Sequence, residues 1–138
     1  MISIFRGGRP IRKTCGVIFL PGQARETPMV HATIRMLIPS KRRGEVLEIL
    51  SSVVERCRFD PGCISCRLYQ SVEARDVIML EEFWRDEEDL ERHLRSDEYR
   101  RVLLVVEMAR EAPEIRFNTI SRSTGVETIE KARNLPPR

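Results

Sequence analysis

The chain has 138 residues, of which 41% are hydrophobic and 33% are charged. This length and balance are typical of one globular domain that can bury its own core without disulfides. No apolar run approaches the roughly 18 residues that a membrane span needs, so we expect no membrane partner. Basic and apolar residues are interleaved at the N-terminus, an order that does not favour a secretory signal.

The net charge of +3 is unevenly distributed. Residues 1–27 carry +4 and residues 122–138 carry +2, so residues 28–121 carry −3. A nucleic-acid binder concentrates its positive charge on its folded surface. Here the excess lies at the two ends of the sequence, and we therefore expect no nucleic-acid partner.

Apolar periodicity divides the chain into three parts. Residues 1–27 contain glycines, prolines and scattered charge without a periodic pattern, which predicts an N-terminal basic arm. Residues 28–123 carry regular patterns and are the predicted domain. Residues 124–138 are a predicted C-terminal extension, with a short helix over 125–134.

The predicted domain begins with a strand over 29–38. Its alternation places one apolar set on one face, namely Val30, Ala32, Ile34, Met36 and Ile38, and leaves His31, Thr33 and Arg35 on the other. Pro39 ends this strand, and Ser40 is the expected N-cap of an amphipathic helix over 41–57.

A turn at Pro61 then leads into an antiparallel hairpin of residues 63–72 and 76–85. Asp86 is the expected cap of the next helix, which would turn Leu90, His93 and Leu94 inward. Ser96 is the expected cap of a further helix, on which Tyr99, Val102, Leu103 and Val106 would share a face.

Pro113 ends that helix, and residues 114–121 form the last predicted strand. The order β-α-β-β-α-β indicates an α+β, ferredoxin-like fold with a four-stranded antiparallel sheet. Helices would cover one face of this sheet. We expect Ile78, Leu80 and Trp84 on the opposite face, where an apolar patch requires a cover.

Three cysteines lie close together in the sequence, at Cys57, Cys63 and Cys66. Cys63 and Cys66 have the spacing of half a zinc site, but no second pair follows at the usual interval. On a regular strand the two would point to opposite faces and would not converge on an ion. We interpret them as buried thiols in a reducing cytoplasm, with a Cys57–Cys63 bridge or a redox pair as the alternative.

Three short motifs occur in a recognisable order: Pro-Gly-Cys at 61–63, Glu-Phe-Trp at 82–84 and His-Leu-x-Ser at 93–96. This order, over about residues 29–121, resembles the antibiotic biosynthesis monooxygenase (ABM) family. Its members pair into a dimeric α/β barrel, with a pocket in each protomer between sheet and helices. The resemblance therefore implies a homodimer that binds a small aromatic substrate or ligand.

The family's characterised enzymes oxidise phenolic or quinol-like aromatics with molecular oxygen, without metal or flavin. This chain has no Gly-rich phosphate loop, HExxH or GxSxG motif, and we expect no cofactor. The first hypothesis is a cofactor-independent monooxygenase of a small quinol or polyketide-like aromatic. The alternatives are a non-catalytic barrel that binds a hydrophobic ligand or protein partner, and an isomerase or dehydratase with His93 as acid–base.

The candidate catalytic residues are His93, as proton acceptor, and Arg35, which could steady a phenolate. The candidate substrate-binding residues are Trp84, Tyr69, Glu82, His31 and Asn118. Each has a structural alternative: a packed histidine, a core tryptophan, or for Glu82 a salt bridge to Arg67 or Arg116. No metal ligands are predicted.

Heme-degrading relatives carry an asparagine on the first strand and a heme-ligating histidine on the second helical segment. This chain has Ala32, Thr33 and Ile34 at the corresponding part of the strand, and residues 99–108 contain no histidine. We therefore do not expect heme degradation.

Overall fold

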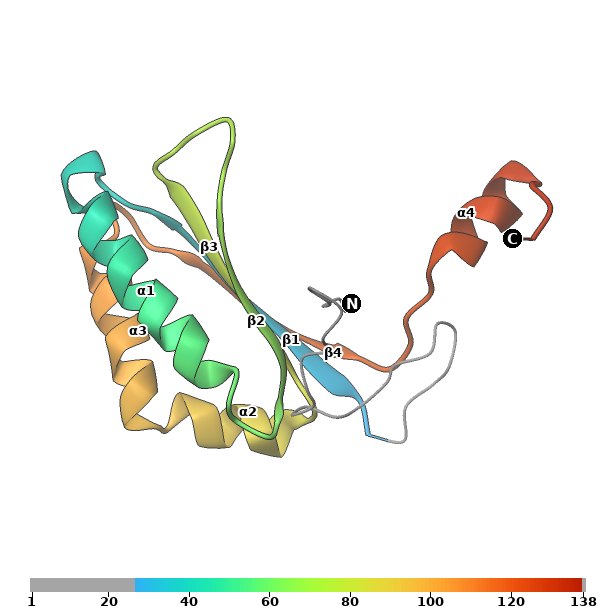
Figure 1. Ribbon diagram of the computed structural model, residues 1–138, viewed down its shortest axis with the longest axis horizontal. Coiled ribbons are helices and arrows are strands. Elements are labelled where there is room, and N and C mark those ends of the chain that lie inside the picture. Colours follow the sequence, from blue (N-terminus) through green and yellow to red (C-terminus); the bar gives the residue numbers. More distant parts are fainter. Residues whose placement is uncertain (1–26, 138) are drawn as a thin grey trace.

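The computed structural model describes residues 27–137. Four antiparallel strands form one sheet in the order β2-β3-β1-β4, with bounds β1 (Met29–Leu37), β2 (Cys63–Gln70), β3 (Val77–Trp84) and β4 (Glu114–Ile120). One face is covered by α1 (Arg43–Cys57), α2 (Glu87–Leu94) and α3 (Asp97–Met108), whereas α4 (Val126–Arg133) stands apart (Figure 1). The ferredoxin-like prediction is confirmed.

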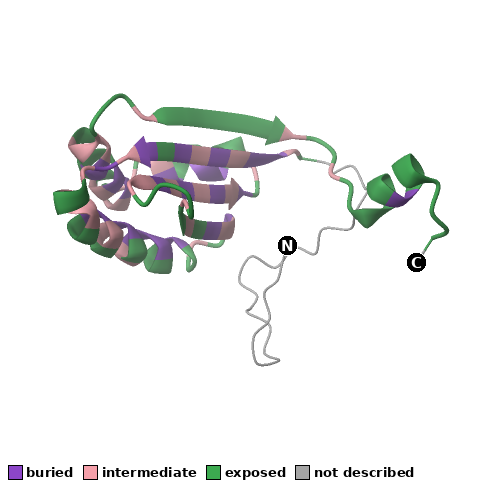
Figure 2. Cartoon of the chain, turned by 90° about the horizontal axis from the view of Figure 1, so that it is seen from above, coloured by how far each residue is buried: buried purple, intermediate pink, exposed green. Residues whose placement is uncertain are grey.

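The core lies between this sheet and the three helices. Val30, Ala32, Ile34 and Met36 of β1 are buried there, as their alternation predicts. Helix α1 contributes Val46, Leu50, Val53, Val54 and Cys57, which recur at helical spacing. The other face of the sheet, which we call the open face, carries side chains that are half-buried or exposed, apart from Met29 at the start of β1 (Figure 2).

Two of the three predicted helix caps are confirmed. The Asp86 carboxylate accepts a hydrogen bond from the Asp89 backbone N–H at 2.8 Å, and the Ser96 hydroxyl accepts one from Tyr99 at 3.2 Å. The prediction for Ser40 is wrong. Ser40 is the first residue of a 3₁₀ turn, η1 (Ser40–Arg42), and makes no capping bond, because this turn precedes α1.

The predicted apolar face of α3 needs a correction at one position. Tyr99 and Val102 are buried, but they are joined by Val105, and Leu103 is 48% exposed. The face formed by residues 99, 102 and 105 is centred on Val102, and position 103, the next residue, is rotated by about 100° from that centre.

The placement of Ile78, Leu80 and Trp84 on the uncovered face is also wrong. All three are buried against the helices. The alternation of side chains along β3 was predicted correctly, but alternation alone does not say which face of the sheet the helices cover. The open face of β3 instead carries Met79, Glu81 and Phe83, each half-buried.

Strand β4 forms an exposed edge of the sheet (Figure 2). Its apolar residues Ile115 and Phe117 are 45% and 48% exposed. The predicted arm falls almost entirely on residues 1–26, which lie outside the described part of the chain. Among residues 27–137, no helix is long and apolar enough to cross a membrane.

Candidate functional site

The end of β3 presents a glutamate and an aromatic ring to each face of the sheet. Alternation turns Glu82 and Trp84 toward the helices and Glu81 and Phe83 toward the open face. A histidine meets each pair, His93 on the helix side and His31 on the open side. Two histidine sites therefore lie on opposite faces of the sheet, at the same end of β3.

The helix-side site is buried. His93 Nε2 lies 2.8 Å from Glu82 Oε1, and the side chains of these two residues are only 5% and 2% exposed. The His93 ring stacks on Trp84 with centroids 4.5 Å apart and meets the edge of Tyr99 at 5.1 Å. Burial, and next the nearby Glu82 charge, raises the pKa of the Tyr99 hydroxyl, so Tyr99 stays neutral.

Within residues 27–137, two polar atoms of this site lack an aligned hydrogen bond. Trp84 Nε1 has no hydrogen-bond partner in this part of the chain, and the contact of His93 Nε2 with Glu82 is close without having hydrogen-bond geometry. Most buried polar atoms in folded proteins are hydrogen-bonded. A ligand with a hydroxyl group could supply the missing partner.

A β-bulge brings Cys63 and Cys66 to the same site. Cys63 pairs with Trp84, Ser65 with Phe83 and Cys66 with Glu82, so the ladder shifts by one residue between positions 63 and 65. Both thiols are therefore buried, at 0% and 1% exposure. The expectation that they point to opposite faces is wrong, because the extra residue of a bulge reverses the strand's parity.

Cys57, at the end of α1, adds a third thiol. Its Sγ lies 3.7 Å from Cys63 Sγ and 3.8 Å from Glu82 Oε1. A hydrogen bond with Cys57 and then burial raise the pKa of the Cys63 thiol. The pKa of Cys57 is also raised: its bond with Cys63 lowers it, but its bond with Cys66 and burial outweigh that effect.

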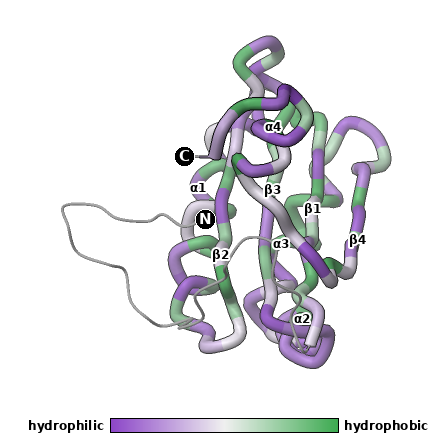
Figure 3. The backbone as a smooth tube through the Cα atoms, turned by 90° about the vertical axis from the view of Figure 1, so that its right-hand side faces the viewer, coloured by the Kyte–Doolittle hydropathy of each residue, from purple (hydrophilic) through white to green (hydrophobic). Residues whose placement is uncertain are grey.

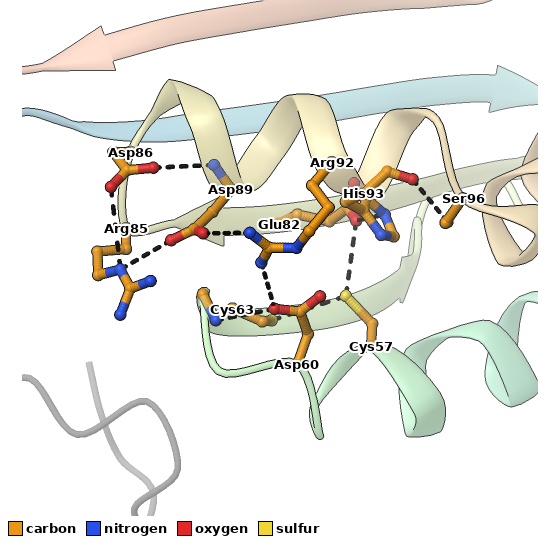
Figure 4. Close-up of polar contacts among 11 residues, drawn as sticks. Cys57, Asp60, Cys63, Glu82, Arg85, Asp86, Asp89, Arg92, His93 and Ser96 are labelled. Carbon is orange, nitrogen blue, oxygen red and sulfur yellow. Dashed lines mark hydrogen bonds and ion pairs between the residues drawn. The ribbon is translucent and has the colours of Figure 1, made fainter.

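Helix α2, which carries His93, is largely hydrophilic (Figure 3) and is held by ion pairs. The buried Asp89 carboxylate contacts Arg85 at 2.7 Å and Arg92 at 2.6 Å. Arg92 also reaches Asp60, in the turn before β2, at 2.9 Å (Figure 4). Burial raises the pKa of Asp89, but hydrogen bonds from Arg92 and Arg85 outweigh burial and lower it.

The open-face site is less buried. His31 Nε2 lies 2.9 Å from Glu81 Oε2, and the Tyr69 hydroxyl donates to Glu81 Oε1 at 3.1 Å. The His31 ring stacks on Phe83 at 4.3 Å. Asn118 is paired with His31 in the adjacent strand, which places it on the same face.

The seven predicted site residues thus fall into two groups. His93, Glu82 and Trp84 come together on the helix side, and the open face carries the remaining four, His31, Arg35, Tyr69 and Asn118. Arg35 lies opposite Met79 on the open face, so the structure does not bring it to His93. The salt-bridge alternative for Glu82 is wrong in its partner: Glu82 contacts His93 and not Arg67 or Arg116, and Arg116 forms an ion pair with Glu114.

Sequence reasoning missed three participants: Glu81, Cys57 and Tyr99. Glu81 could have been found from the sequence, because two adjacent glutamates on a strand point to opposite faces of the sheet. Tyr99 was assigned only to an apolar helix face and Cys57 to buried thiols or a bridge with Cys63, and the sequence has no motif that joins either to His93.

The profile of the antibiotic biosynthesis monooxygenase family matches residues 29–103. A conserved protein from Methanosarcina mazei has a similar structure, with a TM-score of 0.63 and 23% identity, covering 71% of this chain and 95% of its own. A crystal structure described as an antibiotic biosynthesis monooxygenase is similar with a TM-score of 0.60 and 20% identity, covering 64% and 95%. A protein from Mycobacterium tuberculosis is similar with a TM-score of 0.60 and 22% identity, and the match covers 65% of this chain and 92% of that protein. No curated protein sequence matches the chain.

Proposed function

The chain belongs to the antibiotic biosynthesis monooxygenase family, and from this premise we propose that it is a cofactor-independent monooxygenase of a small quinol or polyketide-like aromatic. The observation that carries the proposal is the buried group of Glu82, His93 and Trp84 between sheet and helices. It combines a proton acceptor, a stabilising carboxylate and a flat aromatic surface.

The substrate itself supplies the electrons in this reaction. The Glu82–His93 pair takes up the hydroxyl proton, and the carboxylate stabilises the imidazolium that results. The electron-rich anion then reacts with oxygen. One oxygen atom replaces a ring hydrogen, the other leaves as water, and the quinol becomes a hydroxyquinone. Trp84 would stack on the aromatic ring, and exclusion of water would protect the intermediate.

Access to this site requires movement, because Trp84 and His93 are almost fully buried. Helix α2 is the element that could move, since it is short and is held to the turn before β2 by the exposed Arg92. A bound aromatic would then replace part of the contact between His93 and Tyr99. We expect substrate to protect α2 from hydrogen exchange.

The second part of the proposal is a homodimer that forms through the open face. Met79, Phe83, Tyr69 and Leu37 contribute apolar surface there and are only half-buried or exposed in one chain. Open sheet faces with such residues are seldom left in water. In this arrangement, the Glu81 network of His31 and Tyr69 belongs to the interface.

Oxygen uptake by the purified protein, with quinols and no added cofactor, tests the function. The proposal predicts one oxygen consumed per quinol, one ¹⁸O atom from labelled oxygen in the product, and no hydrogen peroxide. Formation of hydrogen peroxide, with no ¹⁸O in the organic product, would indicate that the quinol is oxidised without incorporation of oxygen. Absence of uptake over a broad panel of aromatics would favour the non-catalytic barrel.

A further inference from the structure

We propose that Cys57, Cys63, Glu82 and His93 form a zinc site. They come from four elements, the end of α1, the start of β2, β3 and α2, and their side chains converge in the core (Figure 4). One ligand atom each from Cys57, Glu82 and His93 lies within 4.8 Å of the other two. We assign Cys63 as the fourth ligand, because its Sγ lies 3.7 Å from Cys57 Sγ, although it is not within 4.8 Å of all three of these atoms.

The distances between these atoms fit a tetrahedral ion. With Zn–S of about 2.3 Å and Zn–O of about 2.1 Å, two sulfurs on one zinc are about 3.8 Å apart, and a sulfur and an oxygen about 3.6 Å. The observed separations are 3.7 Å for Cys57–Cys63 and 3.8 Å for Cys57–Glu82. The 2.8 Å His93–Glu82 contact has to open, to about 3.4 Å, and Cys63 Sγ has to move closer to Glu82 and His93.

The chemistry of the donors also favours zinc. Thiolate together with imidazole suits a borderline-soft ion such as Zn²⁺, whereas magnesium and calcium prefer oxygen ligands alone. Burial of a carboxylate beside a histidine whose Nε2 lacks an aligned hydrogen bond costs free energy, and a divalent cation would offset that cost. Because buried thiols are protonated without metal, binding should release a proton from each cysteine.

This inference does not depend on the proposed function, although the two share residues. Zinc would occupy Glu82 and His93 and prevent proton uptake by them. The metal-loaded protein should therefore consume no oxygen with a quinol. The two occupants are alternatives at one site.

Cobalt substitution tests the site without any substrate. The full chain, with Cys15→Ser so that only the three thiols of the domain remain, is refolded under reductant with one equivalent of Co²⁺. We expect one bound cobalt per chain, strong visible absorption of a tetrahedral ion and a thiolate-to-cobalt charge-transfer band. Zinc should abolish both signals. A pale octahedral spectrum without charge transfer, or no retained cobalt, would overturn the proposal.

Single variants in the same background locate the ligands. Cys57→Ser and Glu82→Gln should each weaken zinc binding by more than the roughly 10²-fold that outer-shell partners contribute. Cys66→Ser is the matched control, a buried thiol on β2 that hydrogen-bonds to Cys57 but is not assigned as a ligand, and its zinc affinity should fall by no more than this roughly 10²-fold. Undiminished affinity in a folded Cys57→Ser protein would refute the assignment.

The results remain separable from those of the proposed function. If Cys57→Ser does not fold, the cobalt spectrum of the parent protein still decides whether thiolates bind the metal. A cobalt–thiolate spectrum in a protein that never consumes oxygen would support the zinc site and refute the monooxygenase. Oxygen uptake by a protein that binds no metal would support the monooxygenase and refute the zinc site.

Discussion

Gly62 and Asp89 are packed so closely that no side chain fits between them: a Cβ on Gly62 would lie 2.4 Å from Asp89 Cγ. Asp89 is the residue that anchors α2 through Arg85 and Arg92. The glycine of the Pro-Gly-Cys turn therefore has a packing role, because it lets the turn before β2 approach the helix that carries His93.

Gly62→Ala should destabilise the fold. The added methyl group must displace Asp89 and weaken its ion pairs, and overpacking of this kind costs about 1–3 kcal/mol. We expect the thermal midpoint to fall by about 4 °C for each kcal/mol. Gly44→Ala in α1 is the control: nothing lies within 4 Å of its Cβ, and helix propensity predicts a slight stabilisation. Equal midpoints for the two variants would contradict the close contact.

Stability at acid pH should depend on Asp89. Its pKa is lowered in the folded protein, despite burial, by hydrogen bonds from Arg92 and Arg85; Asp86 and Asp60 also face these arginines. A lowered folded pKa means that the stabilisation is complete above the unfolded value of about 3.9 and is lost as the pH falls through the folded value.

Urea unfolding of the native protein and Asp89→Asn over a pH series measures this effect. The variant should be less stable near neutral pH by about 1–3 kcal/mol. The difference should shrink below about pH 4, where Asp89 becomes protonated in the unfolded chain, and should vanish below the lowered pKa of the folded protein. A difference independent of pH would show that the charge of Asp89 contributes nothing.

Met79 and Leu80 are neighbours on β3 that point to opposite faces. Met79→Asp should yield a folded monomer, because the charge lies in the proposed dimer interface. Leu80→Asp should fail to fold, because a buried unpaired charge costs several kcal/mol. Light scattering and circular dichroism distinguish these outcomes. A monomeric native protein at micromolar concentration would refute the dimer.

Much of the fold could be predicted from the sequence because local patterns determine it. Alternation identified β1 and β3, Asp86 and Ser96 marked two helix starts, and the turn at Pro61 separated α1 from the hairpin. The face covered by the helices could not be predicted, since it depends on how the whole chain packs.

The site was predicted less completely for two physical reasons. A one-residue bulge between positions 63 and 65 reverses strand parity, and no glycine or proline between those positions marks it. The meeting of Cys57 with Glu82 joins residues 25 positions apart and depends on tertiary packing. His93 and Trp84 were found together only because they belong to motifs of a known family.

The two histidines of the described chain provide the most direct test of the helix-side site. Each contacts a glutamate and stacks on an aromatic ring, but His93 does so inside the core and His31 on the open face. We predict that His93→Gln lowers quinol-dependent oxygen uptake by about 10²-fold, as expected for loss of a proton acceptor, while His31→Gln retains the rate of the native dimer. Uptake that persists in His93→Gln and is lost in His31→Gln would contradict the account.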